Sequence, residues 1–212
     1  MFGRKSEKIG FQGKSIYEID EYLEIERQLP ETYEFWNMDV MPLNRPDDLE
    51  VKVCRSLGKF SEELANRNYK LFLNFPFKKK KVWIKSENCL FYPDLFVVED
   101  EIEFYPDRQD IVSNPRMIIE VSHFDTMAGN RNGERGDQTY LTDRTSKFWK
   151  YQKISSLKEY VIIAHIGVSV LVETYNRQDN KSWKYRAFSE KENAVAHFES
   201  IDIKLPVTEF YI

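Results

Sequence analysis

The spacing of hydrophobic residues predicts two helices in the first third of the chain. Apolar residues recur every three or four positions over 15–28, which is the spacing of one helix face, and Pro30 ends this helix. The same spacing over 49–64 predicts a second helix. Between them, the aromatic-rich segment 32–41 predicts a strand or a tight hairpin.

Strand-like patterns dominate the rest of the chain. The runs 94–99 and 117–122 are short and almost wholly apolar, as in strands buried at the centre of a sheet. Another helix is expected over 143–155. Further strands are expected at 71–75, 82–84, 159–164, 168–174 and 183–188, with an alternating tail at 197–211. This order predicts a mixed α/β (α+β) fold, with a central mixed sheet flanked by helices and an additional antiparallel β part.

Composition narrows the class of protein. The chain has 212 residues, 42% hydrophobic and 15% aromatic, which indicates one well-packed globular domain rather than a disordered chain. We expect a flexible arm at 1–14, where charge and glycine mix without periodicity, and a single domain at 15–212. The absence of a run of about 20 apolar residues predicts no membrane span, and a polar start without an apolar signal segment favours a cytoplasmic location.

Charge and ligand-bearing residues restrict the chemistry further. The 31 basic and 35 acidic residues give a net charge of −4, which excludes a globally basic nucleic-acid coat but leaves room for a local basic cleft. Two cysteines and three histidines are too few for a disulfide framework or a cysteine-based zinc site. Any metal site should therefore be rich in oxygen ligands.

Two acidic residues stand out because they interrupt or open apolar runs. Glu120 lies inside the run 117–122, and Asp94 opens the run 94–99. Glu120 could reach solvent or a salt bridge at a strand end, and Asp94 could be a turn residue. If the two strands are neighbours, however, the acids converge, and carboxylates with main-chain carbonyls suit Mg²⁺. Strand alternation places His123 on the face opposite Glu120, so His123 is not expected to be a ligand.

A third candidate comes from the segment that follows. Asp143, Lys147 and Tyr151 are four residues apart, so they share one helix face. The spacing alone fits an ion pair on a solvated surface, which is the usual fate of such charges. It also fits a lysine placed near a metal, where it would polarise water or a phosphate oxygen.

Several short motifs occur along the chain in a fixed order. They are Tyr17–Leu23, Thr32–Tyr33–Glu34, Pro93–Asp94, Glu120–Val121–Ser122, Asp143 with Lys147 and Tyr151, and Glu159–Tyr160. This order resembles the Uma-type restriction endonucleases of bacteria, a family of the PD-(D/E)xK nuclease-like superfamily. The resemblance runs from about residue 15 to the segment 208–210, and it implies a restriction-endonuclease-like fold.

The resemblance also implies a metal site and a catalytic lysine. Asp94 and Glu120 would be metal ligands for Mg²⁺, or alternatively Mn²⁺, with the Val121 carbonyl as a third ligand. Ser122 stands where the parent motif has a lysine. The resemblance implies that this lysine has moved to the following helix, as Lys147.

The function implied is hydrolysis of phosphodiester bonds in nucleic acid, with DNA as the expected substrate. Glu34 would be an accessory acidic residue, and Tyr151 would support the lysine or contact the substrate. A homodimer is expected because cutting both strands of a duplex often uses paired sites. If Lys147 lies on a helix surface, Lys147→Ala should remove nuclease activity with little effect on folding.

Two alternatives to a nuclease remain open at this point. One is a binding module that keeps the fold and lacks turnover. The other is an interaction protein whose acidic residues form a salt-bridge network. The lysine run 78–81 is equally open, since it fits a solvated hairpin tip, a charged sheet edge or a phosphate-contacting patch.

The polar segment 124–142, which we expect to be a mobile loop, leads to a first testable prediction. It carries Arg131 and Arg135, which we expect to contact phosphates of a bound strand, although an insertion without a role fits as well. Arg131→Ala combined with Arg135→Ala should weaken binding to all sequences and flatten its salt dependence. Each phosphate contact to duplex DNA contributes about 0.9 to the slope of log affinity against log salt. Fluorescence anisotropy over a salt series measures this slope, and identical slopes for both proteins would exclude the contacts.

Overall fold

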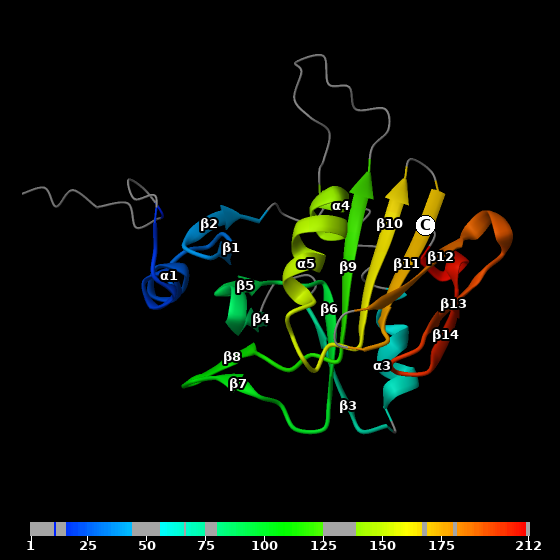
Figure 1. Ribbon diagram of the computed structural model, residues 1–212, viewed down its shortest axis with the longest axis horizontal. Coiled ribbons are helices and arrows are strands. Elements are labelled where there is room, and N and C mark those ends of the chain that lie inside the picture. The colour runs from blue at the N-terminus through cyan, green and yellow to red at the C-terminus, as the bar shows by residue number, and fades with distance from the viewer. Residues whose placement is uncertain are drawn as a thin grey trace, which may run out of the picture.

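The computed structural model describes residues 11, 16–43, 56–65, 67–74, 80–124, 139–166, 169–179 and 182–210. Its strands form two six-stranded sheets and one separate hairpin (Figure 1). The outer sheet contains, in spatial order, β2 (Asp39–Pro42), β1 (Tyr33–Trp36), β5 (Cys89–Phe91), β4 (Lys81–Ile84), β8 (Arg108–Val112) and β7 (Phe104–Tyr105). The central sheet contains β12 (Trp183–Ser189), β11 (Ser169–Arg177), β10 (Glu159–Ile166), β9 (Met117–Phe124), β6 (Leu95–Glu99) and β3 (Tyr69–Leu73).

The central sheet is mixed, because β9 and β10 pair in parallel while its other strands pair antiparallel. The separate hairpin contains β13 (Val195–Phe198) and β14 (Ile203–Pro206). Short 3₁₀ turns complete the strand-rich part of the chain, namely η1 (Lys85–Glu87), η3 (Glu190–Glu192) and η4 (Val207–Phe210). This arrangement confirms the predicted mixed fold with an additional antiparallel part.

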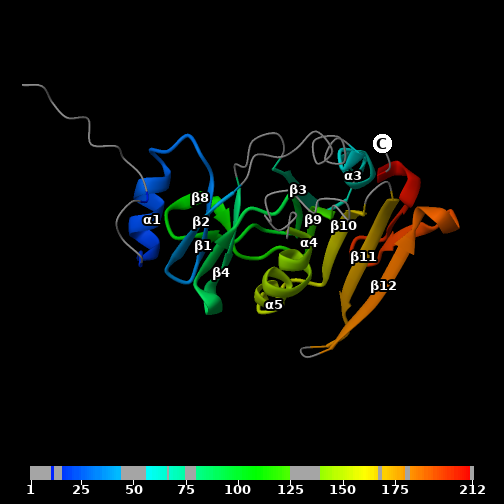
Figure 2. The same cartoon turned by 90° about the horizontal axis from the view of Figure 1, so that it is seen from above.

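The helices are short. They are α1 (Ile19–Glu26), α3 (Lys59–Leu64), α4 (Thr139–Thr142) and α5 (Phe148–Tyr151), with a π-helical segment, η2 (Asp143–Lys147), joining the last two. We refer to α4, η2 and α5 together as the site helix. Figure 2 shows the site helix on one side of the central sheet and α3 on the other. Among the described residues, the helices lack the length and apolar character needed to cross a membrane.

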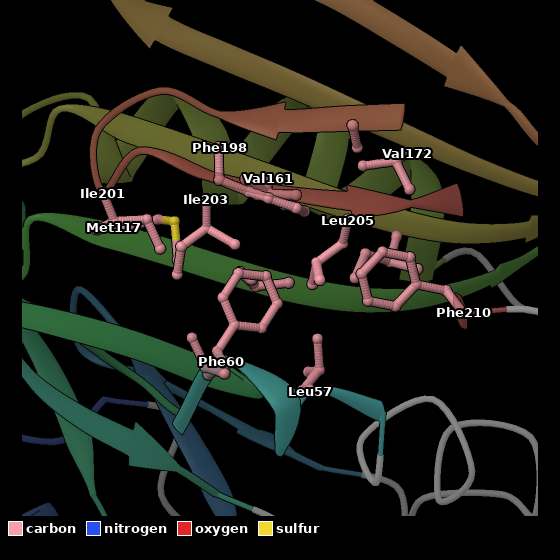
Figure 3. Close-up of a cluster of buried hydrophobic side chains, with 14 of the residues drawn as sticks. Leu57, Phe60, Met117, Val161, Val172, Phe198, Ile201, Ile203, Leu205 and Phe210 are labelled. Carbon is pink, nitrogen blue, oxygen red and sulfur yellow. The ribbon is translucent and has the colours of Figure 1, made fainter. Parts of the chain in front are cut away.

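Alternate residues of the central strands enter two different cores, which explains why their sequences are apolar without alternation. Ile119 and Val121 of β9 pack with α3 and the β13–β14 hairpin. Figure 3 shows other side chains of this cluster. Ile118, on the other face, packs with the site helix and part of the outer sheet. A third cluster joins α1 to the outer sheet through Tyr22 and Phe35. The site helix is therefore fixed between the two sheets by burial.

Most predicted elements are present, with shifts at their ends. The predicted hairpin at 32–41 is β1 and β2, and its turn contains Asn37 and Met38, both with positive φ. The helix predicted over 15–28 is shorter, since α1 covers Ile19–Glu26. Of the helix predicted to reach Leu64, α3 describes the last part, and residues 44–55 lie outside the described residues.

The structure tests the two predicted flexible segments only in part, because most of their residues lie outside the described ranges. The expected arm 1–14 lies outside the described residues except for Phe11, whose ring contacts Tyr17 and Tyr22. The loop expected at 124–142 is wrong at its end, because α4 makes 139–142 helical. The division into an arm and a single domain stays a prediction.

A buried carboxyl group connects the central sheet to the β13–β14 hairpin. Glu159, at the first position of β10, has no exposed surface. Its carboxylate oxygens accept hydrogen bonds from the backbone N–H groups of Glu199 (3.2 Å) and Ser200 (2.9 Å), in the turn between β13 and β14. Burial raises the pKa of Glu159 to about 7, although the hydrogen bonds from Ser200 act in the opposite direction.

This shift predicts a specific pH dependence of stability. A carboxyl group whose pKa is higher in the folded state binds its proton more tightly there, so its contribution to stability is lost as the pH rises from about 4.5 to about 7. Such a shift corresponds to about 3 kcal/mol. We expect Glu159→Gln to remove this part of the pH dependence, in urea unfolding measured across the window. Glu63→Gln, on the exposed face of α3, should keep the wild-type dependence, and an unchanged slope in Glu159→Gln would contradict the assignment.

Candidate functional site

The pairing of β6 and β9 places the two acidic residues side by side. Leu95 lies opposite Ile119, so the next position of this antiparallel register puts Asp94 opposite Glu120. Both side chains are buried. The Asp94 carboxylate also accepts a hydrogen bond from the backbone N–H of Val121, at 2.8 Å. The structure therefore brings together the two carboxylates that the sequence singled out, at the end of β6 and within β9.

A single ammonium group lies among carboxylates from three elements. Lys147 Nζ is 3.1 Å from Glu34 Oε1, 3.5 Å from Glu120 Oε1 and 3.5 Å from Asp143 Oδ1. The four side chains are all buried, with Lys147 8% exposed. The interpretation of Lys147 as a residue of a solvated helix surface is therefore wrong, because the helix carries it between the two sheets. We call Glu34, Asp94, Glu120, Asp143 and Lys147 the acidic cluster.

The segment that carries Lys147 departs from the expected α-helix. Asp143–Lys147 is a π-helical turn, and such turns are rare and frequent at functional sites. Two hydrogen bonds fix Asp143, one to its side chain and one to its backbone carbonyl. The Ser122 hydroxyl donates to Asp143 Oδ2 at 2.5 Å, and the Tyr160 hydroxyl donates to the Asp143 carbonyl at 2.9 Å. The strands β9 and β10 thus fix the wide turn against the sheet.

Tyr151, four residues after Lys147, contacts the same carboxylate oxygen of Glu120. Its hydroxyl donates to Glu120 Oε1 at 3.0 Å, and its side chain has no exposed surface. The ring packs edge-on against Phe91 of the outer sheet, at 5.4 Å between centroids. The structure therefore places Tyr151 in the buried part of the site, hydrogen-bonded to a carboxylate of the cluster.

Glu34 brings the outer sheet into the site. It lies on β1, which pairs with β5, and its Oε1 atom accepts the backbone N–H of Tyr92 at 3.2 Å. The same oxygen contacts Lys147. The acidic cluster is consequently assembled from both sheets and from the site helix.

Burial and mutual charge shift the pKa values of the cluster. Burial raises the pKa of Glu120 well above its usual range, and Lys147 only partly offsets this effect. Burial likewise raises the pKa of Asp143 to about 6. Burial alone would lower the pKa of Lys147, but the carboxylates of Glu120, Glu34 and Asp143 raise it well above 10.5. The ammonium group is therefore charged at neutral pH, and three carboxylates share their ion pairing with it.

The oxygen atoms at β6 and β9 match the ligand preference of Mg²⁺. Asp94 and Glu120 supply carboxylates, and the Val121 carbonyl lies on the same strand as Glu120. Within the described ranges, no group of three or more His, Cys, Asp or Glu side chains is arranged to hold a metal. Two carboxylates and one carbonyl are the donor types used by an ion that takes one or two protein carboxylates and leaves its other positions to water and substrate phosphate.

Sequence reasoning missed a second buried carboxylate that fixes the site helix. Ile162 lies opposite both Glu120 and Glu173, so the two glutamates share one row across three strands. Glu173 accepts hydrogen bonds from Tyr140 (2.9 Å) and Tyr185 (2.6 Å), and Arg144 lies 3.3 Å away. A glutamate inside the apolar strand was the available signal, as it was for Glu120.

Other candidates fall elsewhere. Arg131 and Arg135 lie outside the described residues, so their contact with substrate stays a prediction. Of the lysine run, Lys81 is buried and pairs with Glu26 (3.0 Å) and Asp110 (3.1 Å). A solvated position or a phosphate contact is therefore wrong for Lys81, whose ammonium group forms ion pairs with α1 and β8.

Comparison with known proteins gives two matches. A model of the Uma2 family, described as "Putative restriction endonuclease", matches residues 19–208. A protein of Synechocystis sp. described as "Uncharacterized protein sll1609" is 27% identical over 164 residues, which are 77% of this chain and 82% of that protein. The family match includes every residue of the acidic cluster.

The burial of Lys147 changes the expected effect of replacing it. Lys147→Met leaves three buried carboxylates without their cation, which costs about 3–5 kcal/mol of unfolding free energy in comparable buried pairs. Adding Glu34→Gln should recover part of the loss, because one uncompensated charge is then removed. Lys150→Met is the matched control, since its ion pair with Glu87 is partly exposed and should contribute less than about 1 kcal/mol. Urea unfolding at neutral pH measures all four proteins, and equal stability of wild type and Lys147→Met would show that the cluster does not depend on the ammonium.

Proposed function

The chain belongs to the Uma2 family, and from this premise we propose that it is a metal-dependent nuclease that hydrolyses phosphodiester bonds of DNA. The central mixed sheet flanked by helices is the restriction-endonuclease-like fold that the resemblance implied. The observation that carries the proposal is the acidic cluster. Four buried carboxylates, three of them in contact with one lysine, are costly to assemble for stability alone, because their burial opposes ionisation.

In this proposal, the carboxylates of Asp94 and Glu120 and the carbonyl of Val121 hold Mg²⁺, which Mn²⁺ can replace. The ion, when bound, supplies Lewis acidity toward a phosphate oxygen and lowers the pKa of a bound water. Metal binding requires the ionised form of Glu120, so it displaces the proton that burial favours. Affinity for the metal should consequently rise with pH.

Lys147 performs the second task. Its ammonium group, charged at neutral pH, donates hydrogen bonds to the attacking water or to a phosphate oxygen and offsets the negative charge of the transition state. Glu34 and Asp143 keep it at the edge of the carboxylates rather than in solvent. Tyr151 orients Glu120 through its hydroxyl group. These contacts give the catalytic groups a fixed geometry before substrate binds.

DNA as substrate and a homodimeric state belong to the same proposal. A nuclease with one cluster per chain cuts both strands of a duplex most directly with two copies. Arg131 and Arg135, which follow β9 in the sequence, would contribute phosphate contacts.

A catalytically inactive nuclease fold is the second candidate, and one observation favours it. Lys147 contacts three carboxylates at once, so the cluster is internally paired in the described structure. In this alternative, the chain acts as a nucleic-acid-binding or protein-interaction module, and the cluster only stabilises the junction of the sheets.

Replacing the metal ligands separates the two candidates. Asp94→Asn and Glu120→Gln each keep the shape of the side chain and remove a charge that a divalent ion needs, so cleavage should fall at least about 100-fold. The assay follows cleavage of supercoiled, linear duplex and single-stranded DNA with Mg²⁺, Mn²⁺ or EDTA. Calorimetric titration with Mn²⁺ reports metal binding without cleavage and should show the same loss.

Asp39→Asn, an exposed aspartate on β2, is the matched control and should cut like the wild type. Circular dichroism melting verifies that each variant is folded. A wild type that binds Mn²⁺ and cuts none of the substrates would favour the inactive module, and undiminished cleavage by both ligand variants would place the metal elsewhere.

A further inference from the structure

The outer side of the site helix exposes a large aromatic side chain. Trp149, on α5, is 62% exposed, and the Lys153 ammonium lies 5.0 Å from the centre of its ring. Figures 1 and 2 both show that α5 has the central sheet on one side of it, while its other side faces outward. An exposed tryptophan with a lysine over its ring combines a flat apolar surface with a positive charge.

A surface pocket of about 500 Å³ lies beside this ring, within the usual size of a small-ligand site. The described residues that line it include aromatic, cationic and hydroxyl-bearing side chains and no acidic one: Trp149, Phe148, Arg144, Lys150, Thr145 and Ser146. Every charged group of this lining is positive. The pocket therefore complements an anion that carries an apolar ring.

The two cations that line the pocket each form an ion pair with a glutamate outside the pocket lining. Arg144 pairs with the buried Glu173 and is itself 43% exposed, so its position is fixed while part of it remains accessible. Lys150 pairs with Glu87, and both groups are partly exposed. A partly exposed pair is weak, so a phosphate can take the place of Glu87 at small cost. The pocket can thus bind a phosphate without rearrangement of the backbone.

The same helix presents the acidic cluster on its inner side. Lys147 and Tyr151 point into the cluster, and Trp149, between them in the sequence, points outward. A helix with its side chains is about 10–12 Å across, which about three nucleotides span at the 3.4 Å rise per nucleotide of a duplex strand. The pocket and the acidic cluster are therefore separated by a distance of about three nucleotides.

We propose that Trp149 is a stacking platform for an unpaired base, with the flanking phosphate held by Arg144 and Lys150. The inference rests on the proposed function, and it specifies the substrate as a nucleic acid with a single-stranded segment next to the cleaved bond. Bases inside a duplex are covered on both faces by their neighbours, so the exposed indole selects an unstacked one. The cationic lining favours nucleic acid over an apolar protein surface as the occupant.

The test measures binding in EDTA, so that it does not depend on cleavage. A labelled short single-stranded oligodeoxynucleotide is titrated with the full chain, and anisotropy gives the dissociation constant. Loss of one base–aromatic stack weakens binding of Trp149→Ala about 5- to 100-fold, while Trp149→Phe retains most of the affinity. When the same strand is annealed to its complement, the Trp149→Ala substitution should weaken its binding by a smaller factor. Quenching of tryptophan fluorescence on binding should be smaller in Trp149→Phe than in the wild type.

Leu141→Ala is the matched control, because Leu141 is an exposed apolar residue of the same site helix and does not line the pocket. It should bind within about twofold of the wild type. Equal affinity of Trp149→Ala and wild type would overturn the platform while leaving the nuclease proposal intact. A wild type that binds neither form of DNA would overturn both proposals. A dimer that dissociates in Trp149→Ala, with unchanged affinity for DNA, would assign the surface to a second copy of the chain.

Discussion

The positive charge of Lys147 allows the neighbouring carboxylates of the site to be buried in their ionised form. Glu34, Glu120 and Asp143 are buried within 3.5 Å of its ammonium group, in surroundings where an isolated carboxylate would take up a proton. Because these carboxylates come from different elements, the electrostatic requirement is also a geometric one. The outer sheet, the central sheet and the site helix must meet where the lysine is.

Two further charged groups fix the elements that meet there. In the outer sheet, buried Lys81 joins Glu26 of α1 to Asp110 of β8, and it lies 5.0 Å from the ring of Tyr92, whose backbone N–H holds Glu34. Across the central sheet, Glu173 binds the start of the site helix. The acidic cluster is therefore supported on both sides by ion pairs that do not belong to it, so its geometry is set by the whole domain.

The strands at the site could be predicted, since burial on both faces leaves an apolar run that is hard to mistake. Asp94 and Glu120 were visible for the same reason, because acids in such runs are conspicuous. The role of Glu34 came only from a family resemblance, as its own segment carries no local signal. The burial of Lys147 could not be read from spacing, because a four-residue ion pair has the same pattern on a wet surface.

The remaining misses have related causes. The π-helical turn at Asp143–Lys147 uses residues that also suit an α-helix, and it arises from contacts with Ser122 and Tyr160 on strands distant in sequence. Glu173 was overlooked although it interrupts an apolar strand, and its contacts with Tyr140 and Arg144 join positions about 30 residues apart. The helix propensity of the local sequence does not reflect such tertiary contacts.

The order of the contributing elements along the chain has a consequence for protein synthesis. Glu34 and Lys147 lie 113 positions apart in the sequence, and the elements between them include β6 and β9. Because translation proceeds from the N-terminus, a nascent chain carries Glu34, Asp94 and Glu120 well before the ribosome releases the lysine that neutralises them. A chain that ends before Lys147 therefore lacks the cation of the acidic cluster and cannot assemble it.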